Sequence, residues 1–316
     1  MNKIDLTLRK AYSNKKYGEL AALYKFFNIN VIKAIEGELS SDLANSHSYF
    51  ENLYVDFQWI DKIPLAKLHG EQYDINNNII ENKTEIGDLF IQYRHTLAYS
   101  KEGSEEIHSK TNRSLVIQAK ISDDIPPVVP IGYVNKQRAN STSRELKLLE
   151  HWPEFDLYET SGNSTPLAKN IAVQLQNEPF SFFAAFNNQN KNWLFGKAKN
   201  SQICDLNFSD IIFGLKNSNF GKNTNNDVAW ATISENINNI CRNRNIPETI
   251  ANQIVPRKKS ANITSGTAYS FPLNIYIFIS DIISKITSLF RKKKMLVIFI
   301  DRVSFEGREM EKYRQR

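Results

Sequence analysis

Two short segments, Asp88-Leu-Phe-Ile-Gln-Tyr-Arg94 and Ser114-Leu-Val-Ile-Gln-Ala-Lys120, decide the fold that we predict for this chain. Both are rich in β-branched and aromatic residues and alternate along their length, which is typical of strands. The nineteen residues between them are mostly polar, so we expect a loop or a frayed hairpin tip there. The two segments are therefore predicted to form an antiparallel hairpin.

In a symmetric hairpin, Asp88 lies directly across from Lys120. The two-residue period of a strand then places Asp88, Gln118 and Lys120 on one face. The other face carries the apolar side chains of Leu89, Ile91, Tyr93, Leu115, Ile117 and Ala119. We expect the apolar face to be core and the opposite face to be a polar site. Cross-strand neighbours are about 5 Å apart at Cβ, so a divalent cation fits between Asp88 and Gln118, with the Lys120 amine alongside.

This arrangement suits phosphodiester chemistry. A hard cation such as Mg²⁺ takes oxygen ligands, usually one or two carboxylates together with waters and a substrate phosphate. It lowers the pKa of a bound water and neutralises charge on the phosphate, and a nearby lysine stabilises the same charge or helps to activate the water.

The motif Glu85-Ile-Gly-Asp88, followed by an apolar strand and Val116-Ile-Gln-Ala-Lys120, resembles the PD-(D/E)XK nuclease superfamily in the variant with Gln before X-Lys, as in Mrr-like restriction endonucleases. The resemblance covers roughly residues 31–160. It implies an α/β protein with a restriction-endonuclease-like core, in which a central mixed β-sheet is flanked by helices.

The resemblance also implies roles for individual residues. Asp88 would be the metal-binding aspartate, Gln118 would replace the second acidic ligand, the carbonyl of Ala119 would be a further ligand, and Lys120 would be the catalytic lysine. Glu36 or Glu38 would match a glutamate that the family carries on a helix. Two positions depart from the pattern, because Gly87 stands where the family has Pro and Gln118 is neutral. The missing negative charge would have to come from Glu85, Glu36 or Glu38.

The rest of the chain is predicted to be mixed. Helical spacing predicts helices over 3–27, 31–51, 143–152 and 227–243, and short apolar runs predict strands over 155–159, 180–186 and 193–197. We divide the chain into an N-terminal helical extension over 1–30, a nuclease-like core over 31–160 and a C-terminal α/β region with a basic tail over 161–316. Residues 295–300 are predicted to form a buried strand.

The positive charge of the chain lies near its C-terminus. The formal net charge is +6, but residues 251–316 hold thirteen Lys/Arg against five Asp/Glu, a net +8, so residues 1–250 carry a net −2. Basic runs of this kind neutralise phosphates and make nucleic-acid binding salt-dependent. The expected DNA-binding residues are Arg257, Lys258, Lys259, Arg291, Lys292, Lys293 and Lys294.

Composition indicates a reducing compartment. Two cysteines, Cys204 and Cys241, cannot form a disulfide framework or a four-cysteine zinc site, and the first residues lack the apolar run of a secretion signal. We therefore expect a cytoplasmic protein. Residues 273–290 fit an amphipathic helix, either a core helix, which we favour, or an interfacial one whose basic end meets anionic lipid. A membrane partner is not expected.

Two functions follow as hypotheses. The first is an endonuclease that hydrolyses DNA with Mg²⁺ or Mn²⁺, with a role in bacterial defence against foreign DNA that rests on the resemblance alone. The second is a nuclease-like fold that has lost catalysis and serves as a DNA-binding or scaffolding subunit of a defence complex. In either case we expect a regulatory protein partner or a homo-oligomer, because a nuclease that cuts freely is toxic to its host.

Overall fold

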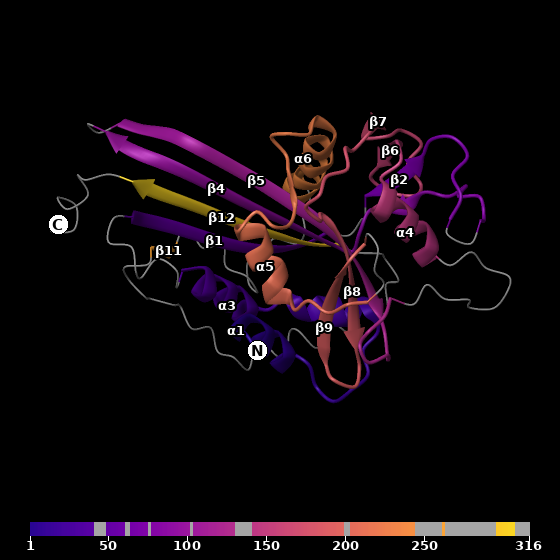
Figure 1. Cartoon of the computed structure of the whole chain (residues 1–316), viewed down its shortest axis with the longest axis horizontal. Coiled ribbons are helices and arrows are strands. Elements are labelled where there is room, and N and C mark those ends of the chain that lie inside the picture. The colour runs from indigo at the N-terminus through magenta and orange to yellow at the C-terminus, as the bar shows by residue number, and fades with distance from the viewer. Residues whose placement is uncertain are drawn as a thin grey trace.

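The protein is an α/β structure in which helices cover both faces of a central mixed sheet (Figure 1). This computed structural model describes residues 1–40, 49–60, 64–74, 77–101, 104–129, 141–198, 203–243, 261–262 and 295–306. The expected fold class, an α/β chain with a mixed central sheet flanked by helices, is confirmed. Further α/β elements follow the predicted hairpin along the chain.

The central sheet has the strand order β11-β1-β12-β4-β5-β8-β9, with β10 paired to β5 beside this path. Neighbours β12 and β4 are parallel, as are β5 and β8, and the other pairs are antiparallel. The strands are β1 (Tyr49–Ile60), β4 (Leu89–Lys101), β5 (Ser104–Ile121), β8 (Ser181–Asn187), β9 (Asn192–Lys197), β10 (Lys222–Asn223), β11 (Ala261–Asn262) and β12 (Met295–Glu306).

Strand β12 lies in the middle of this sheet, between β1 and β4, although it comes last of all the strands in the chain. Residues 295–300 are all buried. Both faces of a central strand are covered by helices, which explains a continuous apolar run in place of alternation. The prediction of a buried strand over 295–300 is confirmed.

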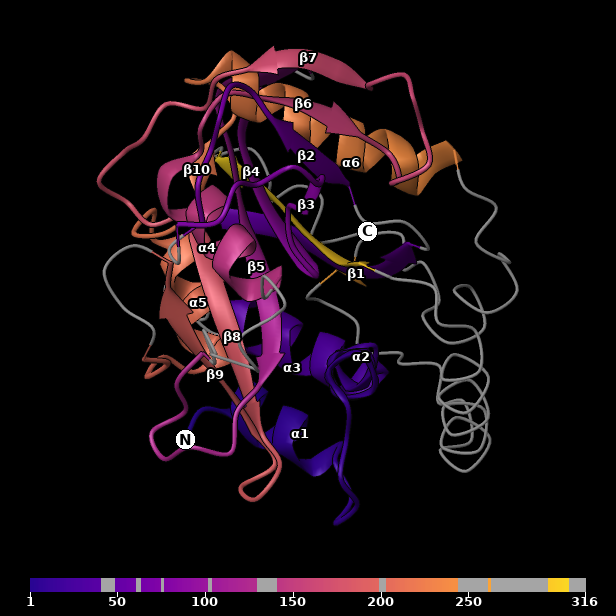
Figure 2. The same cartoon turned by 90° about the vertical axis from the view of Figure 1, so that its right-hand side faces the viewer.

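A smaller antiparallel sheet and six α-helices complete the described part of the fold (Figure 2). The small sheet has the order β3-β2-β6-β7, with β2 (Leu65–Leu68), β3 (Thr84–Glu85), β6 (Phe155–Tyr158) and β7 (Ala168–Ile171). The helices are α1 (Lys3–Lys10), α2 (Glu19–Leu23), a 3₁₀ turn η1 (Tyr24–Phe26), α3 (Ile29–Ser40), α4 (Ser141–His151), α5 (Phe208–Lys216) and α6 (Val228–Asn243).

Side-chain contacts show which helices cover which face of the central sheet. On one face, Glu145 of α4 reaches Lys120, and Trp230 of α6 donates its indole N–H to Ser114 over 2.9 Å. On the other face, Tyr24 packs edge-on against Trp59, and Phe208 of α5 stacks on Phe195. The central sheet is therefore the middle layer, with α4 and α6 on one side and the N-terminal helices with α5 on the other.

Most predicted elements appear, and two predictions are wrong. The helix expected over 31–51 ends as α3 at Ser40, and the described residues from Tyr49 onward form β1. The nineteen residues expected to be a loop or a frayed hairpin tip are mostly paired strand, because β4 and β5 continue as a long hairpin to Lys101 and Ser104, with a bulge between Leu97 and Ala98. Backbone pairing with β12 supports this long hairpin, because β12 runs beside β4 as far as Tyr99.

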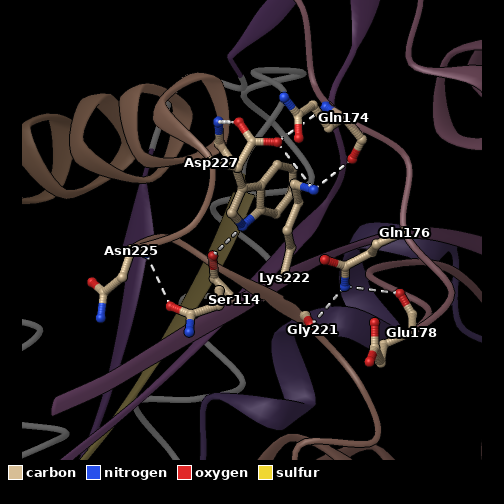
Figure 3. Close-up of polar contacts among 10 residues, drawn as sticks. Ser114, Gln174, Gln176, Glu178, Gly221, Lys222, Asn225 and Asp227 are labelled. Atoms are coloured by element: carbon tan, nitrogen blue, oxygen red, sulfur yellow. Dashed lines mark hydrogen bonds and ion pairs between the residues drawn. The ribbon is translucent and has the colours of Figure 1, made fainter. Parts of the chain in front are cut away.

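A buried ion pair fastens α6 to the sheet (Figure 3). The Lys222 ammonium lies 3.0 Å from the Asp227 carboxylate and also donates to the carbonyl of Gln174, and both charged side chains are at most 5% exposed. Asp227 accepts backbone N–H bonds from Trp230, in the first turn of α6, and from Gln174. Burial acts to raise the pKa of Asp227, but these donors and Lys222 outweigh it and hold that pKa below its ordinary value.

We expect Lys222→Met to lower the free energy of unfolding by about 3–5 kcal/mol, because it leaves the Asp227 carboxylate buried without its counter-charge. The double variant Lys222→Met/Asp227→Asn removes both charges and is expected to recover part of that loss. Urea denaturation at pH 7 measures both, with Lys169→Met at an exposed position of β7 as the matched control. Equal stability of Lys222→Met and the control would contradict a stabilising role for this pair.

Candidate functional site

Asp88 and Gln118 face each other at the start of the β4–β5 hairpin. Leu89 pairs with Ile117, so the position opposite Asp88 is Gln118. The symmetric register that placed Asp88 across from Lys120 is therefore wrong by two residues. A shift by two keeps the parity of the pleat, so Asp88, Gln118 and Lys120 still share one face, as predicted.

The backbone of Asp88 is fixed from both sides. Its N–H donates to the carbonyl of Ile117 in β5 over 2.9 Å, and its own carbonyl accepts from the N–H of Leu296 in β12 over 2.8 Å. The preceding residue must be small, because a Cβ at Gly87 would lie 3.0 Å from the carbonyl oxygen of Ile117. Gly87 thus lets the chain approach β5 closely enough to place Asp88.

The Asp88 carboxylate is held by two donors from β5. Its Oδ2 accepts from Gln118 Nε2 at 2.5 Å and from the N–H of Ala119 at 2.9 Å. The N–H and the carbonyl of one strand residue point to the same side of the strand, so the carbonyl of Ala119 also points toward Asp88. The Gln118 side chain is buried, and its Oε1 has no hydrogen-bond partner in the part of the chain that the structure describes. An acceptor is therefore left unsatisfied beside the carboxylate.

Lys120 is paired with Glu145, a residue that our sequence analysis did not identify. Lys120 Nζ lies 2.8 Å from Glu145 Oε2, and the two side chains are 10% and 4% exposed. Glu145 lies on α4 within one turn of Leu148 and Leu149, which are buried. A glutamate on the apolar side of a predicted helix was the available signal, because such a residue needs a buried partner.

Helix α4 presents Glu145 from a firmly anchored position. Ser143 donates its hydroxyl to Asp74 Oδ2 over 2.7 Å in the interior. At the other end of the helix, the indole N–H of Trp152 donates to Ser181 Oγ in β8 over 2.8 Å. One bond thus joins α4 to the segment after β2 and the other joins its end to the central sheet, so the position of the Glu145 carboxylate is determined by the fold.

A third carboxylate, Glu19 at the start of α2, acts on the same site. Burial is the main cause that raises the pKa of Asp88, to about 8, and the charges of Glu19 and Glu145 add to it against the opposing effect of Lys120. Burial acts to lower the pKa of Lys120, but Glu145, Glu19 and Asp88 outweigh it and raise that pKa. One ammonium thus lies among three carboxylates.

The resemblance suggested Glu36 or Glu38 as the helix glutamate of the site. Glu36 and Glu38 are both on α3, which packs against α1 and β1, and Glu38 accepts a hydrogen bond from Asn2. The carboxylates that act most strongly on Asp88 are instead Glu19 and Glu145. The helix that contains Glu19 was predicted within 3–27, but helical spacing along the chain does not show that α2 lies beside β5.

The polar face of the hairpin is buried as well. Gln118 is 1% exposed and Lys120 8%, because α4 and α6 cover this face. The predicted core face and the predicted polar face are therefore both buried in these strands. The predicted DNA-binding residues Arg257, Lys258, Lys259 and 291–294 lie outside the described residues, as does the predicted helix over 273–290.

Comparison of the chain with protein-family models, with curated proteins and with solved structures finds no match. Among the described residues, no three His, Cys, Asp or Glu side chains are grouped so that they could hold a metal ion by themselves. None of the described helices is long and apolar enough to cross a membrane.

The raised pKa of Asp88 predicts a pH-dependent stability. A carboxyl group whose pKa is raised by folding binds more protons in the native state, so its contribution to stability is lost as the pH rises from about 4 to about 8. We expect Asp88→Asn, which keeps an oxygen acceptor, to become more stable than the wild type by about 1 kcal/mol per pH unit over this range. Denaturant titrations at several pH values measure the difference.

The control for this experiment is Asp123→Asn, because Asp123 is an exposed aspartate outside the site. The stability difference between this control and the wild type is expected to stay constant with pH. A similar pH trend in both variants, or none in Asp88→Asn, would mean that burial does not raise the pKa of Asp88.

Proposed function

We propose that this protein is a metal-dependent DNA endonuclease with a restriction-endonuclease-like core, and that its role is defence against foreign DNA. The observation that carries the proposal is the convergence of Asp88, Gln118 and Lys120 at the start of one hairpin. A helix carboxylate, Glu19, and the Lys120 partner Glu145 join them from separate elements. The defence role rests on the sequence resemblance alone.

The residues present fit a hard cation. Mg²⁺ is usually bound in proteins by one or two carboxylates and keeps several waters, so a group of three acidic ligands is not required. Asp88, the Gln118 Oε1 and the Ala119 carbonyl are the oxygens that would hold it. Gln118 Oε1 is an acceptor without a donor among the described residues, and a cation next to Asp88 would also relieve the repulsion among the three carboxylates. When bound, the ion would activate a water and neutralise phosphate charge.

The chain's own residues supply the remaining functions. The Lys120 ammonium is the one positive side chain among Glu19, Asp88 and Glu145 whose charge can stabilise the anionic phosphate during hydrolysis. Glu145 determines where that ammonium points, since it lies 2.8 Å from Nζ. The backbone bonds at Asp88 keep the carboxylate and the lysine in register, which is the preorganisation that such chemistry needs.

Cleavage of plasmid and linear DNA in Mg²⁺ or Mn²⁺ tests the proposal. We expect the wild type to cut, and both Asp88→Asn and Lys120→Met to reduce the rate by at least about 100-fold, because each removes a group that acts on the transition state. Asp123→Asn is the control for the loss of one carboxylate and is expected to retain the wild-type rate. Cleavage that survives both site substitutions would refute the assignment.

A second function is favoured by one feature of the same site. Asp88 Oδ2 already accepts from Gln118 and Ala119, and Lys120 is already neutralised by Glu145, so both of these charged side chains have partners without a cation. A DNA-binding or scaffolding subunit without catalysis would have such a site. Calorimetry distinguishes the two functions, because heat of Mg²⁺ or Mn²⁺ binding that disappears in Asp88→Asn supports the enzyme, whereas DNA binding with no metal binding supports the subunit.

If the protein is a nuclease, Glu145 is a positioning residue for Lys120. We expect Glu145→Gln to lower kcat about 10- to 100-fold with little change in KM, because the amine loses its ionic partner while the DNA contacts remain. Glu145→Asp, which keeps the charge on a shorter side chain, is expected to restore part of kcat. Steady-state cleavage measures both, with Glu150→Gln on the same helix as control. An unchanged kcat in Glu145→Gln would show that Lys120 does not depend on it.

A further inference from the structure

Two segments far apart in the sequence carry basic residues without any acidic ones. Residues 6–18 contain Arg9, Lys10, Lys15 and Lys16, and residues 179–204 contain Lys191, Lys197 and Lys199, and neither segment has an Asp or Glu. The first segment connects α1 to α2, and the second includes the turn between β8 and β9. This positive charge is separate from that of the C-terminal residues.

The fold joins these two segments. The N–H of Tyr17 donates to Asn188 Oδ1 over 2.8 Å, and Asn188 Nδ2 donates back to the Tyr17 carbonyl over 3.0 Å. Lys191 Nζ, on the same turn, donates to the carbonyl of Lys15 over 2.6 Å. The α1–α2 connection is therefore tied to the β8–β9 turn, and both lie at the lower end of the molecule in Figure 2.

These hydrogen bonds between the two segments bring Lys15 and Lys191 close to the ring of Tyr17. Lys15 Nζ lies 5.3 Å and Lys191 Nζ 5.7 Å from the centroid of the Tyr17 ring, which is itself buried against Tyr12 and Phe186. Lys16 is adjacent in the chain and exposed. None of the three lysines is ion-paired with a carboxylate within the described ranges of the chain. Like charges held together in this way repel, and an anionic partner removes that repulsion.

This lysine cluster, Lys15, Lys16 and Lys191, borders the Asp88 site. Lys120 pairs with Ala185 in the β5–β8 ladder, and β8 continues for only two more residues, about 7 Å, before the β8–β9 turn begins at Asn188. On the other segment, Tyr17 precedes Glu19 by two residues, and Glu19 acts on both Asp88 and Lys120. A polyanion bound by the cluster would thus lie beside the ends of the strands that carry the site.

We propose that Lys15, Lys16 and Lys191 form a surface that binds the phosphodiester backbone of DNA beside the Asp88 site. This inference rests on the proposed function for the identity of the polyanion, and it assigns the backbone contacts to residues that the sequence motif does not include. Lysines bind phosphates as point charges and read no sequence, so the surface positions a duplex without selecting bases.

Binding is tested on the full chain without divalent metal, so that no cleavage occurs. Fluorescence anisotropy of a labelled duplex of about 25 base pairs is measured over a range of KCl concentrations. We expect the triple variant Lys15→Gln/Lys16→Gln/Lys191→Gln to reduce the slope of log K against log[KCl] by about 2–3, close to one phosphate contact per lysine. Lys16→Gln alone, which removes an exposed side chain, is expected to reduce it by about 1.

The matched control removes the same charge elsewhere. Lys33→Gln/Lys67→Gln/Lys169→Gln changes three exposed lysines on α3, β2 and β7 and is expected to leave the slope near that of the wild type. Three results would overturn the proposal. The first is a wild type that binds no DNA, and the second is an equal reduction of the salt slope in the two triple variants. The third, in a parallel measurement with anionic lipid vesicles, is a cluster variant that loses vesicle binding while its DNA binding is unchanged. Salt-dependent binding through the cluster by a protein that does not cleave DNA would instead reject the nuclease activity and retain the surface.

Discussion

The two backbone hydrogen bonds of Asp88 are the constraint on which the site depends. One strand, β5, receives the Asp88 N–H, and another, β12, donates to its carbonyl, so the residue is fixed between the two neighbours of β4. The carboxylate then meets the N–H of Ala119 and the amide of Gln118 without freedom to turn away. Gly87 makes this approach possible because it has no side chain to strike Ile117. The remaining elements place charges around this fixed point.

The electrostatics of the site follow from burial. Asp88, Lys120 and Glu145 are buried and Glu19 is half-buried, so each charge acts strongly on the others. An excess of negative charge is costly there unless a proton or a cation neutralises it. Asp88 takes up a proton at a higher pH than an ordinary aspartate for this reason. The same excess that destabilises the charged site gives it an attraction for positive ligands.

The alternation of residues along β4 and β5 was sufficient to predict which side chains share a face. The two-residue period placed Asp88, Gln118 and Lys120 on one face, and it did so despite an error of two in the register, because parity survives such an error. The contributions of Glu19 and Glu145 could not be predicted in the same way. They depend on how α2 and α4 are packed against the sheet, which is a property of contacts such as Ser143–Asp74 and not of spacing along the chain. The start of β1 was not predicted, because the helical spacing of the residues before it led to a predicted helix that continues to residue 51.

The position of β12 has a consequence for the newly made chain. Asp88 and Leu296, whose hydrogen bond completes the site, are separated by 208 residues. At about 5–20 residues per second, a ribosome needs roughly 10–40 seconds to make the intervening chain. Until then β4 has an open edge, the central sheet lacks its middle strand, and Asp88 lacks one of its two anchors. A polypeptide still being synthesised thus has the motif residues without the geometry that would make them act together.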